Sequence, residues 1–417
     1  MNRFLEFLRS PRFPIFMIVF TDVLGLGITI PVLPLYAKNE LGAAAWQITS
    51  LTSVYFAASF LAGPLLGRLS DRFGRRPVLI ASQAGTLAAL LITGFAPGFF
   101  LLYVARLIDG FTGGNISVAQ AYLSDITDER GRARGLGLIN AAFSLGFVFG
   151  PAMGSGLAAF FGPRVPFFVA AGIALLTVLL STFLLPESLT PERRQAARIQ
   201  TSGPAKSNWQ LLRQPSLALL LLIVFGVNLG FFAFQTVYVL WLERLVFPGQ
   251  PETLVQQAVG AILTAVGLFG VVAQTWLVGP LIRRFGEKHL AIFGNLTRSL
   301  AFVGMALFPS LATVIIGIPL ISIGGGVALP ALIALLTFTA PPGDRGRVIG
   351  LNQSASALGN IAGPLMAGFL FDNVHPNAPM WMAGLVTIAT LGAGLALGFY
   401  RLPVHKPAAG PVREARS

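Results

Sequence analysis

The chain has 417 residues, of which 54% are hydrophobic and only 11% charged, with a formal net charge of +13 and a mean hydropathy of +0.75. This composition is typical of a helical membrane protein with many spans, and it excludes the soluble enzyme folds. The absence of cysteine excludes disulfides, thiolate metal sites and cysteine nucleophiles.

Apolar segments of roughly 20 residues follow one another along the whole chain. The first begins near Pro14, and it is too long, with no small-residue cleavage site, for a removable signal peptide. We therefore predict an all-α membrane protein with twelve transmembrane helices, at residues 14–36, 47–67, 77–96, 99–123, 135–161, 166–185, 216–241, 257–281, 289–308, 312–339, 347–371 and 378–400.

The distribution of positive charge predicts the orientation in the membrane. With an inside N-terminus, most of the 29 Lys and Arg residues fall in inside segments, whereas the outside loops contain only Lys38, Arg164 and Arg244. We expect both termini to be cytoplasmic and the protein to lie in a bacterial inner membrane. The positive charge is thus explained by the lipid bilayer, and no nucleic-acid partner is expected.

A charged segment, Gly67–Arg76, separates the second and third spans, and Gly67 and Gly74 are expected to turn the backbone between them. Similar segments recur in the second half of the chain, which indicates a duplication. The pairs are Gly67–Arg76 with Gly279–Lys288, Glu129–Arg132 with Asp344–Arg347, and Gly150-Pro151 with Gly363-Pro364.

The longest inside connection is polar and lies between the sixth and seventh spans, as expected for a linker between two halves. We predict a six-helix half at residues 1–186, a cytoplasmic linker at 187–213, a second six-helix half at 214–404 and a disordered tail at 405–417. The two halves are expected to be related by pseudo-two-fold symmetry.

The chain resembles the major facilitator superfamily over nearly its whole length, and in particular the twelve-span drug:proton antiporters of the tetracycline-efflux and multidrug groups. The segments that carry the resemblance are Asp22–Pro34, Gly67–Arg76, Arg106 with Gly110 and Gly113, Gly146–Gly154 and Gly324–Ala331. The resemblance implies the major facilitator fold and export by alternating access. Acids of the tetracycline exporters correspond to Ala89 and Arg298, and a span-seven glutamate of one multidrug branch corresponds to Gln235, which argues against tetracycline as the substrate.

Charged residues inside spans cost about 2.5–3.5 kcal/mol each, so each requires a reason. Asp22 and Asp109 lie near the middle of spans one and four, and Arg106 is placed three residues before Asp109 on the same helix face. The resemblance implies that Asp22, Asp109 and Arg106 couple transport to protons. The alternative is an Arg106–Asp109 pair that only fixes span four, whereas Arg298 is expected to pack against a neighbouring helix.

Asp71 has two interpretations, since it balances the neighbouring arginines or, as the resemblance implies, connects the two halves. In the second case it meets the positive end of span eleven and the basic loop after span four. The predicted conformational latch consists of Gly67, Asp71, Arg72, Gly74, Arg75 and Arg132.

A stripe of small residues on span five predicts close helix packing, and a Gly-Pro pair bends the helix in each half. We interpret this stripe as a seam on which the two halves rock. Its residues are Gly146, Gly150, Pro151, Gly154, Gly363 and Pro364.

Polar side chains on otherwise apolar spans are candidates for contacts with a small amphipathic substrate. They are Asn140, Asn228, Gln235, Tyr238, Asn352 and Asn360.

The sequence favours a monomeric, proton-coupled exporter of drugs, with no cofactor and no metal. A proton-coupled importer of the same fold remains an alternative. A membrane-embedded enzyme is disfavoured, because the sequence contains no His-Glu-x-x-His or Gly-x-Ser-x-Gly pattern and its three histidines lie at span ends or in the tail. No phosphate-binding Gly-Lys-Ser/Thr is present either.

Overall fold

The computed structural model describes residues 10–189, 208–340 and 344–397, apart from the side chains of 129–134 and 396–397. These residues form helices joined by short turns and contain no strand, so the prediction of an all-α fold is confirmed. The first part of the chain forms α2 (Arg12–Asn39), α3 (Ala45–Phe73), α4 (Arg75–Phe95), α5 (Phe99–Thr112), the 3₁₀ turn η1 (Gly113–Asn115), α6 (Ile116–Ile126), α7 (Glu129–Phe161) and α8 (Val165–Leu184).

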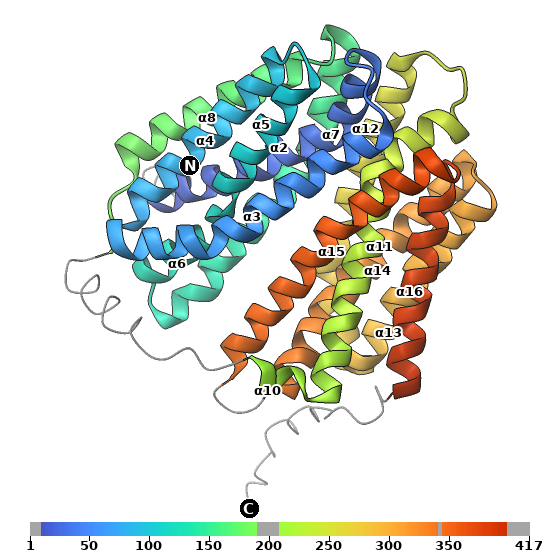
Figure 1. Cartoon of the computed structure of the whole chain (residues 1–417). Coiled ribbons are helices and arrows are strands. Elements are labelled where there is room, and N and C mark those ends of the chain that lie inside the picture. Colours follow the sequence, from blue (N-terminus) through green and yellow to red (C-terminus); the bar gives the residue numbers. More distant parts are fainter. Residues whose placement is uncertain (1–9, 190–207, 341–343, 398–417) are drawn as a thin grey trace, which may run out of the picture.

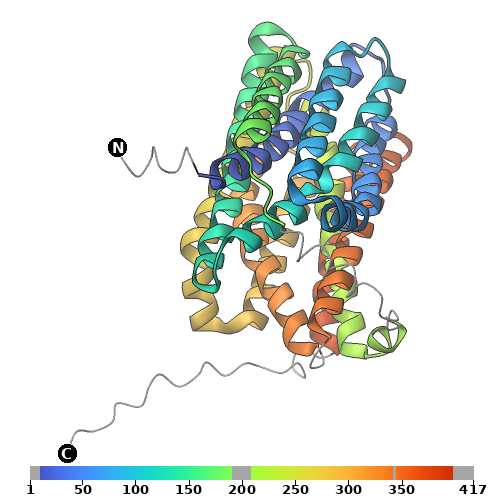
Figure 2. The same ribbon diagram turned by 90° about the vertical axis from the view of Figure 1, so that its left-hand side faces the viewer.

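The second part of the chain repeats this plan. It forms α10 (Trp209–Leu212), α11 (Pro215–Trp241), η2 (Leu242–Val246), α12 (Glu252–Val272), η3 (Ala273–Leu277), α13 (Val278–Leu307), α14 (Leu311–Thr339), α15 (Arg345–Asn373) and α16 (Ala378–Leu397). The helices α2–α8 and α11–α16 gather into two bundles, drawn blue to green and yellow-green to red in Figure 1. Figure 2 shows the same two bundles from the side.

Ten helices of the described residues are long and apolar enough to cross a membrane. The difference from the twelve predicted spans has two causes. Span four is divided by η1 into α5 and α6, each shorter than a full span. Spans eight and nine form one unbroken stretch, Glu252–Leu307, which turns at Gly286, where φ is 75°. Each of the twelve predicted spans therefore corresponds to helix in the structure.

The segment Gly67–Arg76 is almost entirely helical. α3 continues to Phe73 and α4 begins at Arg75, so the turn is the single residue Gly74, whose φ of 108° favours glycine. Gly67 lies inside α3, and the prediction that it turns the backbone is wrong. The matching glycine of the second half, Gly286, adopts the same kind of left-handed conformation, as the internal duplication predicts.

The small-residue stripe on α7 packs within its own bundle. A Cβ atom added at Gly150 would lie 2.7 Å from the Gly27 Cα, and one at Gly146 would lie 2.8 Å from the Val23 Cβ, both on α2. Gly363 of α15 likewise contacts the α11 backbone around Leu229. The prediction that this stripe lies between the halves is wrong, because its glycines join helices of one bundle.

Other glycines make the close contacts between the bundles. Gly260 and Gly267 of α12 pack against α7, and Gly368 of α15 packs against the start of α3. Polar contacts also join the two bundles. Lys38 Nζ lies 2.7 Å from a Glu243 carboxylate oxygen, and the Trp46 N–H donates to Asp372 Oδ2 over 2.7 Å. These contacts lie near the helix ends opposite Gly74, so they hold the bundles together at the expected outer side.

The packing of α7 on α2 predicts a difference between two glycine substitutions on one helix. Gly150→Ala forces a methyl group into the α2 backbone and should destabilise the protein by about 1–3 kcal/mol. Gly137→Ala, on an exposed part of α7 with no atom near the added Cβ, should be neutral or stabilising by up to about 1 kcal/mol. Thermal unfolding of the purified variants in detergent measures both. Equal melting temperatures would contradict this account of the helix contact.

Candidate functional site

Asp22 lies on α2 and is hydrogen-bonded by neutral side chains of α4. Gln83 Nε2 donates to Asp22 Oδ1 over 2.7 Å, and Thr86 Oγ1 donates to the same oxygen over 3.3 Å. The second oxygen, Oδ2, is buried without a hydrogen bond among the described residues, and the buried Asn115 side chain lies near the carboxyl group. The carboxyl group therefore has polar contacts on one oxygen and no charged residue bonded to it.

Arg106 and Asp109 form the second buried polar group of this bundle. Arg106 Nη1 lies 3.2 Å from Asp109 Oδ2, and Arg106 Nη2 donates to Thr93 Oγ1 of α4 over 3.5 Å. Only 3% of the Arg106 surface is exposed. The guanidinium thus pairs with Asp109 in this conformation, while Asp22 keeps its own, neutral partners.

Tyr55 of α3 lies beside this group because α5 approaches α3 closely. A Cβ atom at Gly110 would meet the Tyr55 backbone, and one at Gly113 would lie 3.0 Å from the Tyr55 hydroxyl oxygen. Tyr55 was not among the predicted site residues, and neither were the Asp22 neighbours Gln83, Thr86 and Asn115. Gln83 and Thr86 stand three residues apart in an apolar span, which is the signal that could have identified them.

A cavity of about 220 Å³ lies between the two bundles. Its wall is mainly aliphatic and aromatic, and Arg106 is the charged residue in it. The lining residues are Leu26, Thr29, Ile30, Leu33, Pro34, Ile48, Thr52, Tyr55, Phe56, Arg106, Phe143, Phe147, Phe231, Phe232, Gln235 and Thr236. An apolar pocket with few polar groups is the usual form of a site for small organic molecules.

Of the six predicted substrate contacts, only Gln235 lines this cavity. Asn228 donates to the Val224 carbonyl oxygen over 2.8 Å, and Tyr238 is buried against Trp241 and Phe234. Asn140 is exposed, and Asn352 and Asn360 are half-buried on α15. The rest of the cavity wall is mainly aliphatic and aromatic residues and threonines, which were not among the predicted substrate contacts.

Arg298 of α13 is buried, with 2% of its surface exposed. Its guanidinium carbon lies 5.1 Å from the centre of the Phe231 ring, and Nη2 donates a long hydrogen bond of 3.5 Å to the Val227 carbonyl oxygen, both on α11. The side chain therefore packs against a neighbouring helix, as the sequence analysis expected, and does not reach lipid.

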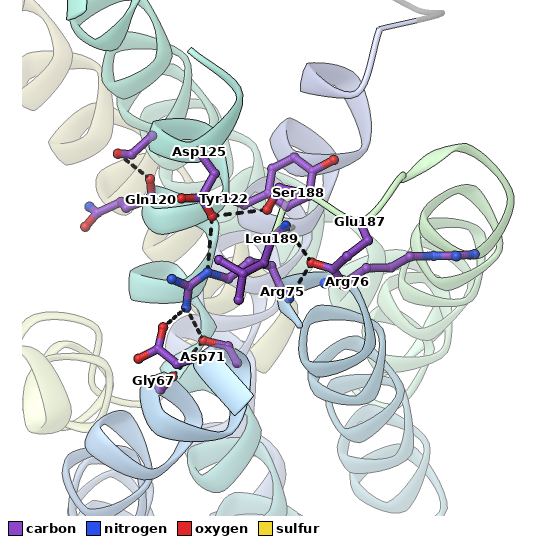
Figure 3. Close-up of polar contacts among 12 residues, drawn as sticks. Gly67, Asp71, Arg75, Arg76, Gln120, Tyr122, Asp125, Glu187, Ser188 and Leu189 are labelled. Carbon is purple, nitrogen blue, oxygen red and sulfur yellow. Dashed lines mark hydrogen bonds and ion pairs between the residues drawn. The ribbon is translucent and has the colours of Figure 1, made fainter. Parts of the chain in front are cut away.

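The predicted latch residues lie at the opposite end of the first bundle, near Gly74. Arg75 connects three groups there: Nη1 lies 2.6 Å from Asp71 Oδ1 and 2.6 Å from Ser70 Oγ, and Nε lies 3.4 Å from Asp125 Oδ2 (Figure 3). Arg72 is exposed and stacks on the Phe73 ring at 5.3 Å. The side chain of Arg132 lies outside the described residues.

The chain that follows α8 returns to this cluster. Glu187 accepts hydrogen bonds from the backbone N–H groups of Arg75 and Arg76, at 2.9 Å and 3.2 Å, and so caps the start of α4 (Figure 3). Ser188 Oγ donates to Asp125 Oδ2 over 3.2 Å. The first residues of the predicted linker are therefore fixed to the first bundle, whereas 190–207 lie outside the described residues, as do the tail residues 405–417.

Asp71 contacts its own bundle in this conformation. Its ion-pair partner is Arg75, one turn further along the chain, and among the described residues no ion pair joins it to α15. In this conformation Asp71 therefore does not connect the two bundles at the end near Gly74.

Comparisons with known proteins agree with this architecture. The sequence profile of the Major Facilitator Superfamily matches residues 15–258 and 250–417. The chain is 33% identical to the class C tetracycline resistance protein of Escherichia coli, covering 87% of this chain and 90% of the relative. It is 34% identical to multidrug resistance protein 2 of Bacillus subtilis strain 168, covering 90% and 92%.

A solved structure shows the same fold. The nucleoside transporter NupG superposes with a TM-score of 0.77 over 93% of this chain and 100% of its own, at 15% sequence identity. At that identity the likeness shows the fold alone.

The contacts of Arg75 predict that it contributes more to stability than Arg72, although both residues have the same side chain. A lysine at position 75 cannot bridge Asp71, Ser70 and Asp125 together, so Arg75→Lys should destabilise the protein by about 1–3 kcal/mol. Arg72→Lys, which loses only an exposed stacking contact, should leave the melting temperature within error. Thermal unfolding of the two purified variants makes the comparison, and a larger loss from Arg72→Lys would overturn it.

Proposed function

Because the chain belongs to the Major Facilitator Superfamily, we propose that it is a proton-coupled exporter of drugs or other small amphipathic molecules. The proposal draws support from relatives that are named for tetracycline and multidrug resistance. The observation that carries it is the buried Asp22 carboxyl group, held by neutral donors in the bundle that forms most of an apolar cavity wall. The membrane is the bacterial inner membrane, with both termini on its cytoplasmic side.

Asp22 is the proposed carrier of the coupled proton. A carboxyl group without a charged partner changes the local charge by one unit when it binds or releases a proton. In a low-dielectric site this change alters the electrostatic energy of a nearby charged substrate. Asp109 is less suited to the task, because Arg106 already balances its charge at 3.2 Å. Binding of a proton to Asp22 and binding of a substrate with a positive group then oppose each other, as antiport requires.

The proton gradient supplies enough free energy for uphill export. Each proton moving down a potential of 100 mV releases about 2.3 kcal/mol, and each unit of pH difference adds about 1.4 kcal/mol. Together these amounts support a concentration ratio of roughly several hundredfold for one proton per substrate.

Alternating access follows from the movement of the two halves, residues 1–186 and 214–404. In the conformation described, the contacts between them gather near Lys38, Trp46, Glu243 and Asp372, at the outer end. The proposed latch would close the cytoplasmic end in the opposite conformation, when Asp71 leaves Arg75 and approaches the start of α15. Residues 187–189, which are bonded to the turn at Gly74, would move with the first half.

Proton coupling predicts different effects for the two buried acids. In proteoliposomes with an imposed pH difference, Asp22→Asn should abolish uphill export while binding and downhill movement of substrate persist. Asp109→Asn should reduce the rate more mildly, since it breaks a pair that is already neutral as a unit. A protonophore should collapse export by the unchanged protein.

Two outcomes would contradict this assignment. If Asp22→Asn still pumped uphill and Asp109→Asn did not, the roles of the two acids would have to be exchanged. Export that survives the protonophore, or that requires ATP, would exclude the proton antiporter altogether.

The latch proposal predicts a shift in conformation on loss of one charge. Cysteines at positions 38 and 243 in this cysteine-free chain, joined by a short bifunctional thiol reagent, report closure of the outer end. Asp71→Asn should increase their cross-linking, because the outward-open conformation loses its cytoplasmic contact, whereas Asp71→Glu should have a smaller effect. Unchanged cross-linking together with normal export would leave Asp71 as a partner of Arg75 alone.

A further inference from the structure

Arg298 is the buried cation that the proposed proton coupling leaves unused. Its Nε has no hydrogen-bond partner among the described residues, and its Nη2 donates a long hydrogen bond to the Val227 carbonyl oxygen. A Cβ atom at Gly324 would lie 3.0 Å from the Arg298 Cγ and one at Gly325 would lie 4.0 Å from its Cδ. The glycines of α14 therefore leave room for the stem of this side chain.

No carboxylate of the described residues lies within ion-pair distance of Arg298. A buried charge without a partner is costly, and an aliphatic or amide side chain of similar size would avoid that cost. The face of Phe231 offsets part of it through a cation–π contact. The incomplete set of partners indicates that a further, negatively charged group joins Arg298 during the transport cycle.

The position of Phe231 connects this cation to the cavity. Phe231 lines the cavity, and the Arg298 guanidinium lies over its ring at 5.1 Å, so one aromatic ring separates the charge from the cavity. On the opposite side of the cavity, the first bundle contains Asp22 and the balanced pair of Arg106 and Asp109. Asp22 and Arg298 are not themselves in the cavity wall; they lie in different halves of the molecule, Asp22 about one turn of α2 before the lining residue Leu26 and Arg298 against the lining ring of Phe231.

We propose that Arg298 is an anion-binding subsite, and that the transported molecule is a zwitterion whose acidic group pairs with Arg298 while its ammonium group faces Asp22. This inference rests on the proposed function and specifies its substrate class. Antiport requires that the substrate group facing Asp22 be positively charged. Protonation of Asp22 then removes the charge that attracts the ammonium group, which releases that end of the molecule. An anion without an ammonium group would gain from the same protonation and could not be exchanged for the proton.

The test uses a matched pair of probes, a piperazinyl fluoroquinolone and its methyl ester, which lacks only the acidic group. The purified full-length protein should bind the free acid at least about tenfold more tightly than the ester by isothermal titration calorimetry near neutral pH. Arg298→Met should remove this preference while the affinity for the ester stays within about twofold. Arg298→Lys, which keeps the charge, should retain part of the preference.

Proton-driven export of the ester in proteoliposomes separates the two proposals. If the unchanged protein exports the ester and binds both probes equally, the subsite is wrong and the exporter stands. If it neither binds nor exports either probe, the drug-like substrate class is contradicted and the subsite with it. If Arg298→Met does not fold, the test uses the unchanged protein and Arg298→Lys. The inference predicts that both bind the free acid more tightly than the ester, and equal binding of the two probes by the unchanged protein overturns it.

Discussion

The cost of placing a charge in hydrocarbon is the constraint on which the rest of this structure depends. It is expected to keep most arginines and lysines of the loops on one side of the membrane, and it requires that each charge inside a span be enclosed by protein. Three charged residues are enclosed in this way. Asp22 is bonded to α4, and Arg106 contacts Asp109 and Thr93. Arg298 packs against α11. Burying these groups costs stability that apolar residues would not, and this cost is the reason for which a role in transport is proposed for them.

Glycine provides the close packing that makes such enclosure possible. Within each bundle, glycines of α7 and α15 bring these helices against the backbones of α2 and α11. Between the bundles, glycines of α12 and α15 do the same against α7 and α3. The contacts within a bundle join helices over their central turns, whereas the contacts between bundles extend from the end opposite Gly74 to about the middle of the helices. This difference suits two units that remain intact while the interface between them opens and closes.

The twelve spans and the internal duplication could be predicted from the sequence, because a membrane span must satisfy its backbone hydrogen bonds internally and must be about 20 apolar residues long. Finer features were missed for reasons of local geometry. Hydropathy cannot distinguish a loop from a charged helix end, so Gly67 was placed in a turn that only Gly74 forms. Likewise, the small residues of η1 break span four without changing its hydropathy.

The candidate site was harder to predict, because a polar residue in a span identifies its helix but not the direction in which it points. Asp22, Arg106 and Asp109 were found from the cost of their charge alone. Gln83, Thr86 and Asn115 are neutral, and only the packing of α2, α4 and η1 shows that they surround Asp22. The same uncertainty in helix orientation explains why Tyr238 and Asn228 were expected in the cavity, although they pack into the second bundle.

In the proposed mechanism, the charges in the two bundles would couple the free energy of the proton gradient to the binding of substrate. A proton on Asp22 acts on one bundle, whereas Arg298 belongs to the other, so a molecule that contacts both groups senses the relative position of the bundles as well as the protonation state. Phe231 would contribute to this coupling, because it both lines the cavity and covers the guanidinium. A substrate that displaces the ring exchanges a cation–π contact for a stronger ion pair, and only a molecule with an acidic group can make that exchange. Selectivity would then arise from a charge that is hidden when the cavity is empty, which limits the cost of keeping it in the membrane.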